Sequence, residues 1–366
     1  MSRIPSLNTR AALGEITHTF NTAREDVVKP SALTNRSNTA RGLTSNLARR
    51  RAQKTILPSA QRRIDSELSL KNVDEAVTFI DDLNLANIPD IDSQDAHDPQ
   101  VVFEYIDDIY KFLRKNELEK RFNHKYMKDQ VDINERMRTI LVDWLIDVHL
   151  KFKLLPETLF LTTNIIDRFL NHKQVARQKF QLVGVTAMLI ASKYEEIYAP
   201  EVRDFVYITD RAYSKDEILK MERLILATLD FRLTVPTHYT FVKRFIKAAG
   251  VGSSSKVSSS TSKKMELLFC YILELAQPHT NYLKYLPSHI DAAALWLARK
   301  VLTGDSDWHQ VLTKYTQYDD EQLMPCVREL AQLMRNASTA EQKAAYRKYS
   351  SARFGEVARL PVPSNL

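Results

Sequence analysis

Two apolar segments of the same pattern, 107 residues apart, constrain the fold of this 366-residue chain most. They read Ala187-Met-Leu-Ile-Ala-Ser-Lys193 and Ala294-Leu-Trp-Leu-Ala-Arg-Lys300. Each is nearly apolar all round, which is typical of a helix surrounded by other helices. The chain also has only seven glycines against 13 prolines, so it is poor in the residue that β-turns and bulges favour. We therefore predict an all-α chain of two similar domains, each built around one buried helix.

Helical periodicity extends on both sides of these segments. A leading helix is expected from about Pro99, with Asp98 as its N-cap. The stretch 137–229 predicts short helices of about ten to sixteen residues, with breaks near 155–156, 171–172, 199–200 and 210. A second helical run covers 236–349 and is interrupted by the Gly/Ser-rich insertion 250–262, whose composition is typical of a flexible loop.

The N-terminal segment differs from the rest in composition and charge. Residues 1 to about 70 show no sustained helical period, which predicts disorder. Residues 1–71 carry 13 Lys/Arg against five Asp/Glu, whereas residues 72–108 carry 11 acidic residues and no Lys or Arg. The basic part has one aromatic residue, Phe20, so it offers no stacking platform for nucleic acid. A solvated arm is therefore favoured, with no direct nucleic-acid contact.

Motifs for catalysis, metals and membranes are missing from the sequence. Its GxG, at 250–252, lacks a third glycine and a preceding strand, and no phosphate loop, nucleophile elbow or zinc helix is found. The two cysteines, Cys270 and Cys326, fit ordinary packing in a reducing compartment. The longest strongly apolar stretch, 182–191, is about half a membrane span. We expect an intracellular protein that is not an enzyme, takes no cofactor or metal, and binds other proteins.

Two segments hint at where such binding occurs. In 137–152 the apolar arc is about twice the width that an amphipathic surface helix needs. Part of it must face the core, and Trp144 beside Met137 favours a binding surface on another part, although a wholly buried helix fits the pattern equally well. The buried segment 182–191 is followed by Lys193-Tyr194-Glu195-Glu196. The charged side chains there must reach either solvent or a partner protein, and solvent is favoured.

Longer runs of sequence resemble the cyclin box of a mitotic cyclin. They are Met137-Arg-Thr-Ile-Leu-Val-Asp-Trp-Leu145, Asn164-Ile-Ile-Asp-Arg-Phe-Leu170, Gln181-Leu-Val-Gly-Val-Thr-Ala-Met-Leu-Ile-Ala-Ser-Lys-Tyr-Glu-Glu-Ile-Tyr198 and Phe205-Val-Tyr-Ile-Thr-Asp210. Lys151-Phe-Lys-Leu154 and Tyr194 favour the B-type over the A-type. The resemblance implies tandem cyclin folds of five helices each: a disordered regulatory tail over 1–94, a cyclin box with its leading helix over 95–233, a second cyclin fold over 234–350 and a tail over 351–366.

The resemblance also implies a role as the activating subunit of a cyclin-dependent serine/threonine kinase at the G2/M transition. Lys193 and Glu222 would bond to the kinase main chain beside its regulatory helix. Apolar contacts would come from Tyr194, Leu226, Phe231, Tyr105, Ile106 and Ile109.

A second implied surface would recruit Arg-x-Leu segments of substrates and inhibitors. Its apolar residues would be Met137, Ile140, Leu141 and Trp144, with Asp147 pairing the arginine and Gln181 bonding the peptide backbone. Arg138 and Asp167 resemble a structural salt bridge of the box. For Arg203, Arg211 and Lys215, a solvated basic face is favoured over a phosphate pocket.

The tail segment Arg10-Ala-Ala-Leu13-Gly14-Glu-Ile16 resembles a destruction box, which implies removal through a ubiquitin ligase of the anaphase-promoting type. His18 stands where the family has asparagine. We expect the nucleus and the cytoplasm as locations. Two alternatives stay open at this point: a cyclin-fold general transcription factor that binds DNA, favoured by the pI of about 9.1, and an A-type or S-phase cyclin.

Overall fold

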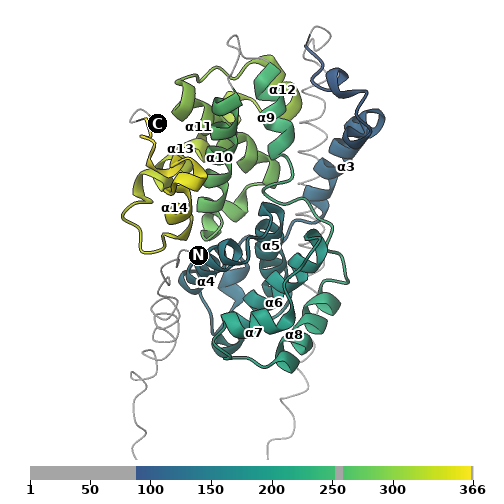
Figure 1. The fold of residues 1–366 in the computed structure, drawn as a ribbon, viewed down its shortest axis with the longest axis vertical. Helices are drawn as coiled ribbons and strands as arrows, with labels where there is room; N and C mark the ends of the chain where they lie inside the picture. Colours follow the sequence, from purple (N-terminus) through teal and green to yellow (C-terminus); the bar gives the residue numbers. More distant parts are fainter. Residues whose placement is uncertain (1–87, 252–258, 364–365) are drawn as a thin grey trace, which may run out of the picture. The chain divides into compact units, whose positions relative to one another are not determined.

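The computed structural model describes residues 88–251, 259–363 and 366, all within one compact unit, and it contains helices but no strand over these ranges (Figure 1). Five helices form a first bundle: α4 (Glu135–Phe152), α5 (Pro156–His172), α6 (Arg177–Glu195), α7 (Val202–Ile208) and α8 (Lys215–Thr228). Five more form a second: α9 (Val242–Val251), α10 (Ser259–Ala276), α11 (Pro287–Thr303), α12 (Gln310–Thr316) and α13 (Asp320–Asn336). A short helix, α14 (Ala344–Tyr349), follows. The predicted all-α fold of two five-helix domains is confirmed.

The two repeated apolar segments lie at the centres of the two bundles. Residues 182–192 of α6 and 290–299 of α11 are all buried. In the first bundle α6 packs against α5 and α8, and in the second α11 packs against α10 and α13. Gly184 lets α4 approach α6 closely, because a Cβ atom there would lie 2.8 Å from Cδ1 of Leu141.

Local signals place the helix ends where the sequence predicts breaks. The Asn134 side chain accepts a hydrogen bond from the N–H of Met137 and so caps α4. Proline begins α5 and α11, and Ser214 with Glu217 forms a capping box at the start of α8. In the first bundle, helix lengths range from seven residues in α7 to 19 in α6, a wider spread than predicted.

The leading helix begins later than the sequence suggests. Asp98 does cap, since its side chain accepts from the N–H of Gln100, but residues 99–105 form two short 3₁₀ turns. Val102 lies between them with a φ of 54°, and this left-handed residue interrupts a continuous α-helix. The α-helix proper, α3, runs from Ile106 to Glu119.

Ordered contacts also extend beyond the expected domain ends. The expected tail includes residues 88–94, yet Ile91 is buried and the Asp92 carboxylate forms ion pairs with Arg244 and Lys247 of α9. At the other end, residues 351–359 form two 3₁₀ turns, and Val357 is fully buried. Burial of an apolar residue and pairing of a buried charge each hold a short segment in place.

Buried polar contacts join the two bundles at Arg138. Its Nε and Nη2 atoms donate to the two carboxylate oxygens of Asp167 at 2.7 and 2.8 Å. Its Nη1 donates to the carbonyl oxygens of Gln277 and Pro278 in the second bundle at 2.9 and 3.0 Å. The Tyr126 hydroxyl donates to the same carboxylate at 2.6 Å. The expected salt bridge is present, and it serves the fold.

Over the described ranges, no helix is both long and apolar enough to cross a bilayer. The same part of the chain gathers no group of three His, Cys, Asp or Glu side chains that would hold a metal ion. Cys270 and Cys326 are both buried, and burial raises the pKa of each thiol.

Candidate protein-binding surfaces

An ion pair marks the surface formed by α6 and α8. Lys193 lies in the last turn of α6, and its Nζ is 2.7 Å from Oε1 of Glu222 on α8. The lysine side chain is 49% exposed and the glutamate side chain 13%. Lys193 and Glu222 are 29 positions apart in the sequence, and the packing of α6 against α8 brings them together. Both are expected from the family resemblance to contact the same partner.

Apolar side chains accompany this pair. Tyr194 and Phe231 are 46% and 70% exposed, and Leu226 is half-buried. The Tyr194 hydroxyl hydrogen-bonds to Thr234, which ties the end of α6 to the segment after α8. Phe231 lies in a left-handed turn, with its N–H donating to the carbonyl of Leu226. We call Lys193, Glu222, Tyr194, Leu226 and Phe231 the α6–α8 surface; exposed apolar side chains gathered in this way are typical of a protein contact site.

Helix α3 has one packed face and one free face. Tyr110 and Arg114 contact the second bundle: Tyr110 lies against Phe241, and Arg114 donates to the Ser288 hydroxyl. Toward the other face, Tyr105 at the N-cap of α3 is exposed, as are Ile109 and Phe112 within the helix, while Ile106 is half-buried. Phe112 was missing from the predicted site, although its spacing from Tyr105 and Ile109 places it on the same helical stripe.

Two further exposed apolar residues were missed. Ile197 and Tyr198 are 89% and 91% exposed and lie in the loop between α6 and α7. Glu196, next to them, accepts hydrogen bonds from the backbone N–H of Leu155 and from the Thr158 hydroxyl. These two bonds fix the start of the loop against α5. Helical periodicity gives no signal for residues outside helices, so the exposure of this pair emerged only from the structure.

The predicted docking patch, comprising Met137, Ile140, Leu141, Trp144, Asp147 and Gln181, lies on α4 and the start of α6. Met137, Leu141 and Trp144 are only 8%, 5% and 6% exposed, and Ile140 is half-buried. The wide apolar arc of α4 is therefore mostly core, and the patch exposes little apolar surface.

Two polar groups at the edge of the docking patch differ in their partners. Nε2 of Gln181 is buried without a hydrogen-bond partner. The Asp147 carboxylate is already engaged, since Oδ2 lies 2.7 Å from Nη2 of Arg347 on α14. Burial raises the pKa of Asp147, and the guanidinium of Arg347 opposes that rise.

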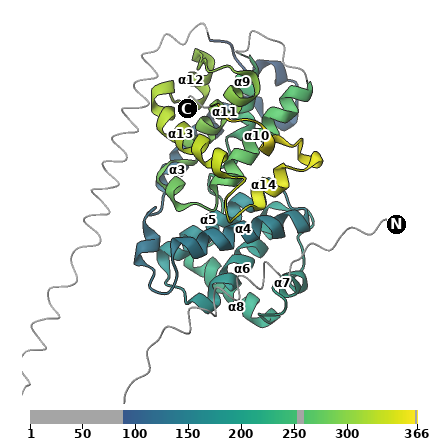
Figure 2. The same ribbon diagram turned by 90° about the vertical axis from the view of Figure 1, so that its left-hand side faces the viewer.

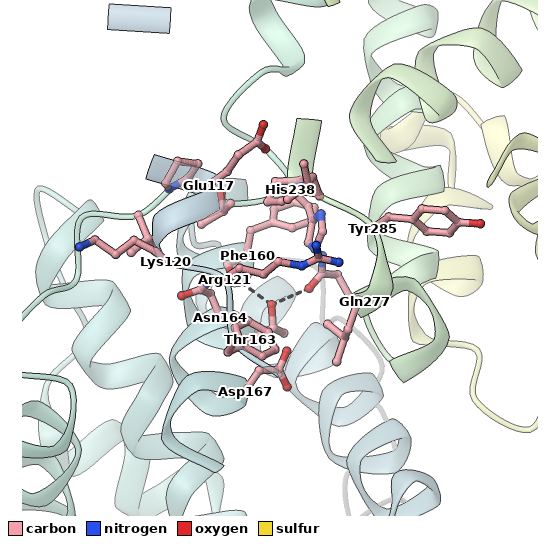
Figure 3. A pocket seen from close by; sticks show the side chains of 17 residues that line it. Glu117, Lys120, Arg121, Phe160, Thr163, Asn164, Asp167, His238, Gln277 and Tyr285 are labelled. Atoms are coloured by element: carbon pink, nitrogen blue, oxygen red, sulfur yellow. Dashed lines mark hydrogen bonds between the residues drawn. The ribbon is translucent and has the colours of Figure 1, made fainter. Parts of the chain in front are cut away.

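A small cavity lies where the two bundles meet (Figure 3). Its volume is about 60 Å³, and its polar lining includes Thr163, Asn164 and His238. The Thr163 hydroxyl donates to Gln277, whereas Asn164 Oδ1 and His238 Nδ1 are buried without partners. Desolvation lowers the pKa of His238 to about 4, so the ring is neutral at physiological pH. The lining pairs no nucleophile with a base, and the size suits a few water molecules.

The three basic residues considered for phosphate binding are all exposed. Arg203 pairs with Glu201 at 2.9 Å and stays 78% exposed, while Arg211 lies in a left-handed turn after α7. Solvated cations of this kind need no ligand. The destruction-box residues Arg10, Leu13, Gly14 and Ile16 lie outside the described residues.

Comparisons with known proteins agree with this architecture. The chain matches the cyclin N-terminal domain over residues 108–234 and the cyclin C-terminal domain over residues 236–363. A viral cyclin from herpesvirus saimiri has a similar structure, with a TM-score of 0.56 and 19% identity over 64% of this chain and 98% of that one. These two bundles are therefore tandem cyclin folds.

Relatives in sequence show which type of cyclin the chain resembles. The chain is 40% identical to the G2/mitotic-specific cyclin-B of Marthasterias glacialis, over 97% of its own length and 89% of that protein. It is 44% identical to Cyclin-B2-2 of Oryza sativa subsp. indica, over 80% of its own length and 65% of that protein, so it spans less than two thirds of the rice relative. The chain belongs to the B-type cyclins. This assignment replaces the A-type and transcription-factor alternatives.

Proposed function

We propose that this chain is the regulatory subunit of a cyclin-dependent serine/threonine kinase that acts at the G2/M transition, and that it catalyses no reaction itself. The observation that carries the proposal is the α6–α8 surface. There the Lys193–Glu222 pair lies beside the exposed apolar side chains of Tyr194 and Phe231. A polar pair next to apolar anchors suits a partner that presents both main-chain groups and an apolar helix face.

Activation follows from selective binding. The cyclin binds only the kinase conformation in which the regulatory helix is turned inward. Binding therefore favours the state in which a Lys–Glu pair of the kinase orients the ATP phosphates. Converting a kinase from 1% to 99% active needs a differential affinity of about 5.5 kcal/mol. The free face of α3, with Tyr105, Ile109 and Phe112, adds apolar area toward that total.

Kinase binding is tested by calorimetric titration of a monomeric cyclin-dependent kinase with the full chain. We expect the Lys193→Ala, Glu222→Ala double variant to weaken binding at least tenfold. A matched control exists on the same two helices, because Lys179 and Glu217 form an equally short exposed pair, 2.7 Å apart, near their N-terminal ends. The Lys179→Ala, Glu217→Gln double variant breaks this pair, keeps a side chain at residue 217 that can complete the capping box of α8, and is expected to bind as wild type does. If both double variants bind the kinase with the same affinity, the α6–α8 surface is not the kinase-binding site.

Substrate recruitment is the second part of the proposal. The docking patch would accept Arg-x-Leu segments of substrates and inhibitors, with the unpartnered Nε2 of Gln181 donating to the peptide backbone. Because Trp144 is only 6% exposed, its removal would disturb the core, so Gln181→Ala is the cleaner test. We expect this variant to raise KM for an Arg-x-Leu substrate and to leave a substrate without the motif unaffected. Equal effects on both substrates would contradict docking at the patch.

Removal of the chain is the third part. Arg10, Leu13, Gly14 and Ile16 would form a destruction box read by a ubiquitin ligase of the anaphase-promoting type, and the chain would act in the nucleus and the cytoplasm. Replacing Arg10 and Leu13 with alanine should prolong the life of the protein in mitotic extract. An unchanged half-life would remove this part of the proposal and leave the kinase role intact.

A further inference from the structure

The C-terminal segment 341–349 lies against the outer edge of α4. Figure 2 shows α14 beside α4, and the two helices pack together. Three polar contacts join the segment to α4: Glu341 pairs with Arg136 at 3.2 Å, the Asp143 carboxylate accepts from the N–H of Ala344 at 2.8 Å, and Arg347 pairs with Asp147 at 2.7 Å. The segment therefore borders the docking patch along its acidic side.

The backbone of α14 is held in place from its opposite face. Lys348 and the Tyr349 hydroxyl both bond to the buried carboxylate of Glu274 on α10, and the Tyr349 ring contacts Tyr271. By contrast, the side chain of Arg347 is 52% exposed. A fixed backbone with a half-exposed side chain keeps the guanidinium close to Asp147 and still allows it to swing into solvent.

We infer that Arg347 is a built-in competitor of the docking arginine. A carboxylate that already holds one guanidinium must release it before it can take a second in the same geometry. This inference rests on the proposed docking function of Asp147. It assigns Arg347 a role in specificity. Arg347 weakens the binding of Asp147 to the arginine of a docking segment, so that docking depends correspondingly more on the apolar contacts and on Gln181.

The size of the effect follows from the exposure of the pair. Exposed ion pairs are weak, so the competing contact is easily broken, and its removal should raise docking affinity about threefold to fivefold. The gain should be confined to ligands with an arginine at the position that meets Asp147. A ligand with alanine there does not need the carboxylate and should bind with unchanged affinity.

The test is fluorescence titration of the full chain with two peptides, one carrying Arg-x-Leu and one with alanine in place of the arginine. We expect Arg347→Ala to bind the arginine peptide about threefold to fivefold more tightly than wild type and the alanine peptide equally. Arg353→Ala is the matched control, because Arg353 is an exposed arginine of the same C-terminal region and lies over Phe354. In an Asp147→Asn background, the gain from Arg347→Ala should disappear.

Unchanged or weaker binding of the arginine peptide by Arg347→Ala would overturn the competitor role while leaving docking itself in place. An equal gain for both peptides would also overturn it, because the segment would then merely obstruct the patch. If neither peptide binds wild type or any variant, the docking function fails, and the competitor role fails with it.

Discussion

The guanidinium of Arg138 binds both carboxylate oxygens of Asp167, at 2.7 and 2.8 Å, and the two side chains are only 1% and 3% exposed. The same guanidinium reaches the carbonyls of Gln277 and Pro278, so one buried cation connects the first cyclin fold to the second. Removing either partner leaves the other charge buried and unpaired.

Arg138→Ala is therefore expected to lower the free energy of unfolding by about 3–5 kcal/mol. The neighbouring Arg136 provides a control, because its pair with Glu341 is 72% and 71% exposed and Arg136→Ala should cost at most about 1 kcal/mol. Urea denaturation measures both. Similar losses for the two variants would mean that the buried pair contributes no more than a surface contact.

Asp291 on the central helix α11 gives stability a pH dependence. Oδ1 of its carboxylate is buried without a partner, and burial raises the pKa well above its ordinary value. The folded chain thus favours the protonated acid. The penalty for ionising it is absent below the unfolded pKa of about 3.9, grows as the pH rises, and is complete above the folded pKa.

Asp291→Asn should therefore stabilise the chain at pH 7–8, and the difference from wild type should shrink toward zero near pH 4. Thermal unfolding across this range is the measurement. A variant that is less stable than wild type at pH 8 would show that the ionised carboxylate is needed in the core.

Gly184 tests the close packing of α4 on α6. An added Cβ would lie 2.8 Å from Cδ1 of the buried Leu141, so Gly184→Ala must displace that side chain and should cost about 1–3 kcal/mol despite the better helix propensity of alanine. Gly250 in α9 has no atom within 4 Å of such a Cβ, and Gly250→Ala should be neutral or slightly stabilising. If Gly184→Ala were also stabilising in urea denaturation, the interface would be looser than described.

Phe231 tests the apolar part of the α6–α8 surface. It is 70% exposed in the free chain, and Tyr207 on α7 is equally exposed. If Phe231 anchors the kinase, Phe231→Ala should weaken kinase binding by about thirtyfold, the loss typical of an interface hot spot of 2 kcal/mol. Tyr207→Ala should bind the kinase as wild type does. The reverse order of effects in a calorimetric titration would move the interface to α7.

Much of the fold could be predicted because its signals are local. The apolar repeats at 187–193 and 294–300 identified both central helices, and proline and capping residues fixed most helix starts. The start of α3 could not be predicted in this way, because the left-handed φ of Val102 leaves no mark in the hydrophobic pattern.

The candidate sites depended more on long-range contacts. The spacing of residues suggested neither the Lys193–Glu222 pair nor the Arg347–Asp147 pair, the latter joining positions 200 residues apart. Lys193 and Glu222 were found through family resemblance, whereas Arg347 became visible only when α14 was placed beside α4. Periodicity also left the wide apolar arc of α4 ambiguous, and the burial of Met137, Leu141 and Trp144 shows that most of it serves the core.

Kinase activation is the most direct test of the account. A purified monomeric cyclin-dependent kinase would be assayed on a histone peptide alone, with the full chain, and with the Lys193→Ala, Glu222→Ala double variant. We predict strong activation by the wild-type chain, loss of most of it with this variant, and full activation by the Lys179→Ala, Glu217→Gln control. Absence of activation by a folded wild-type chain across several kinase paralogues would contradict the regulatory role.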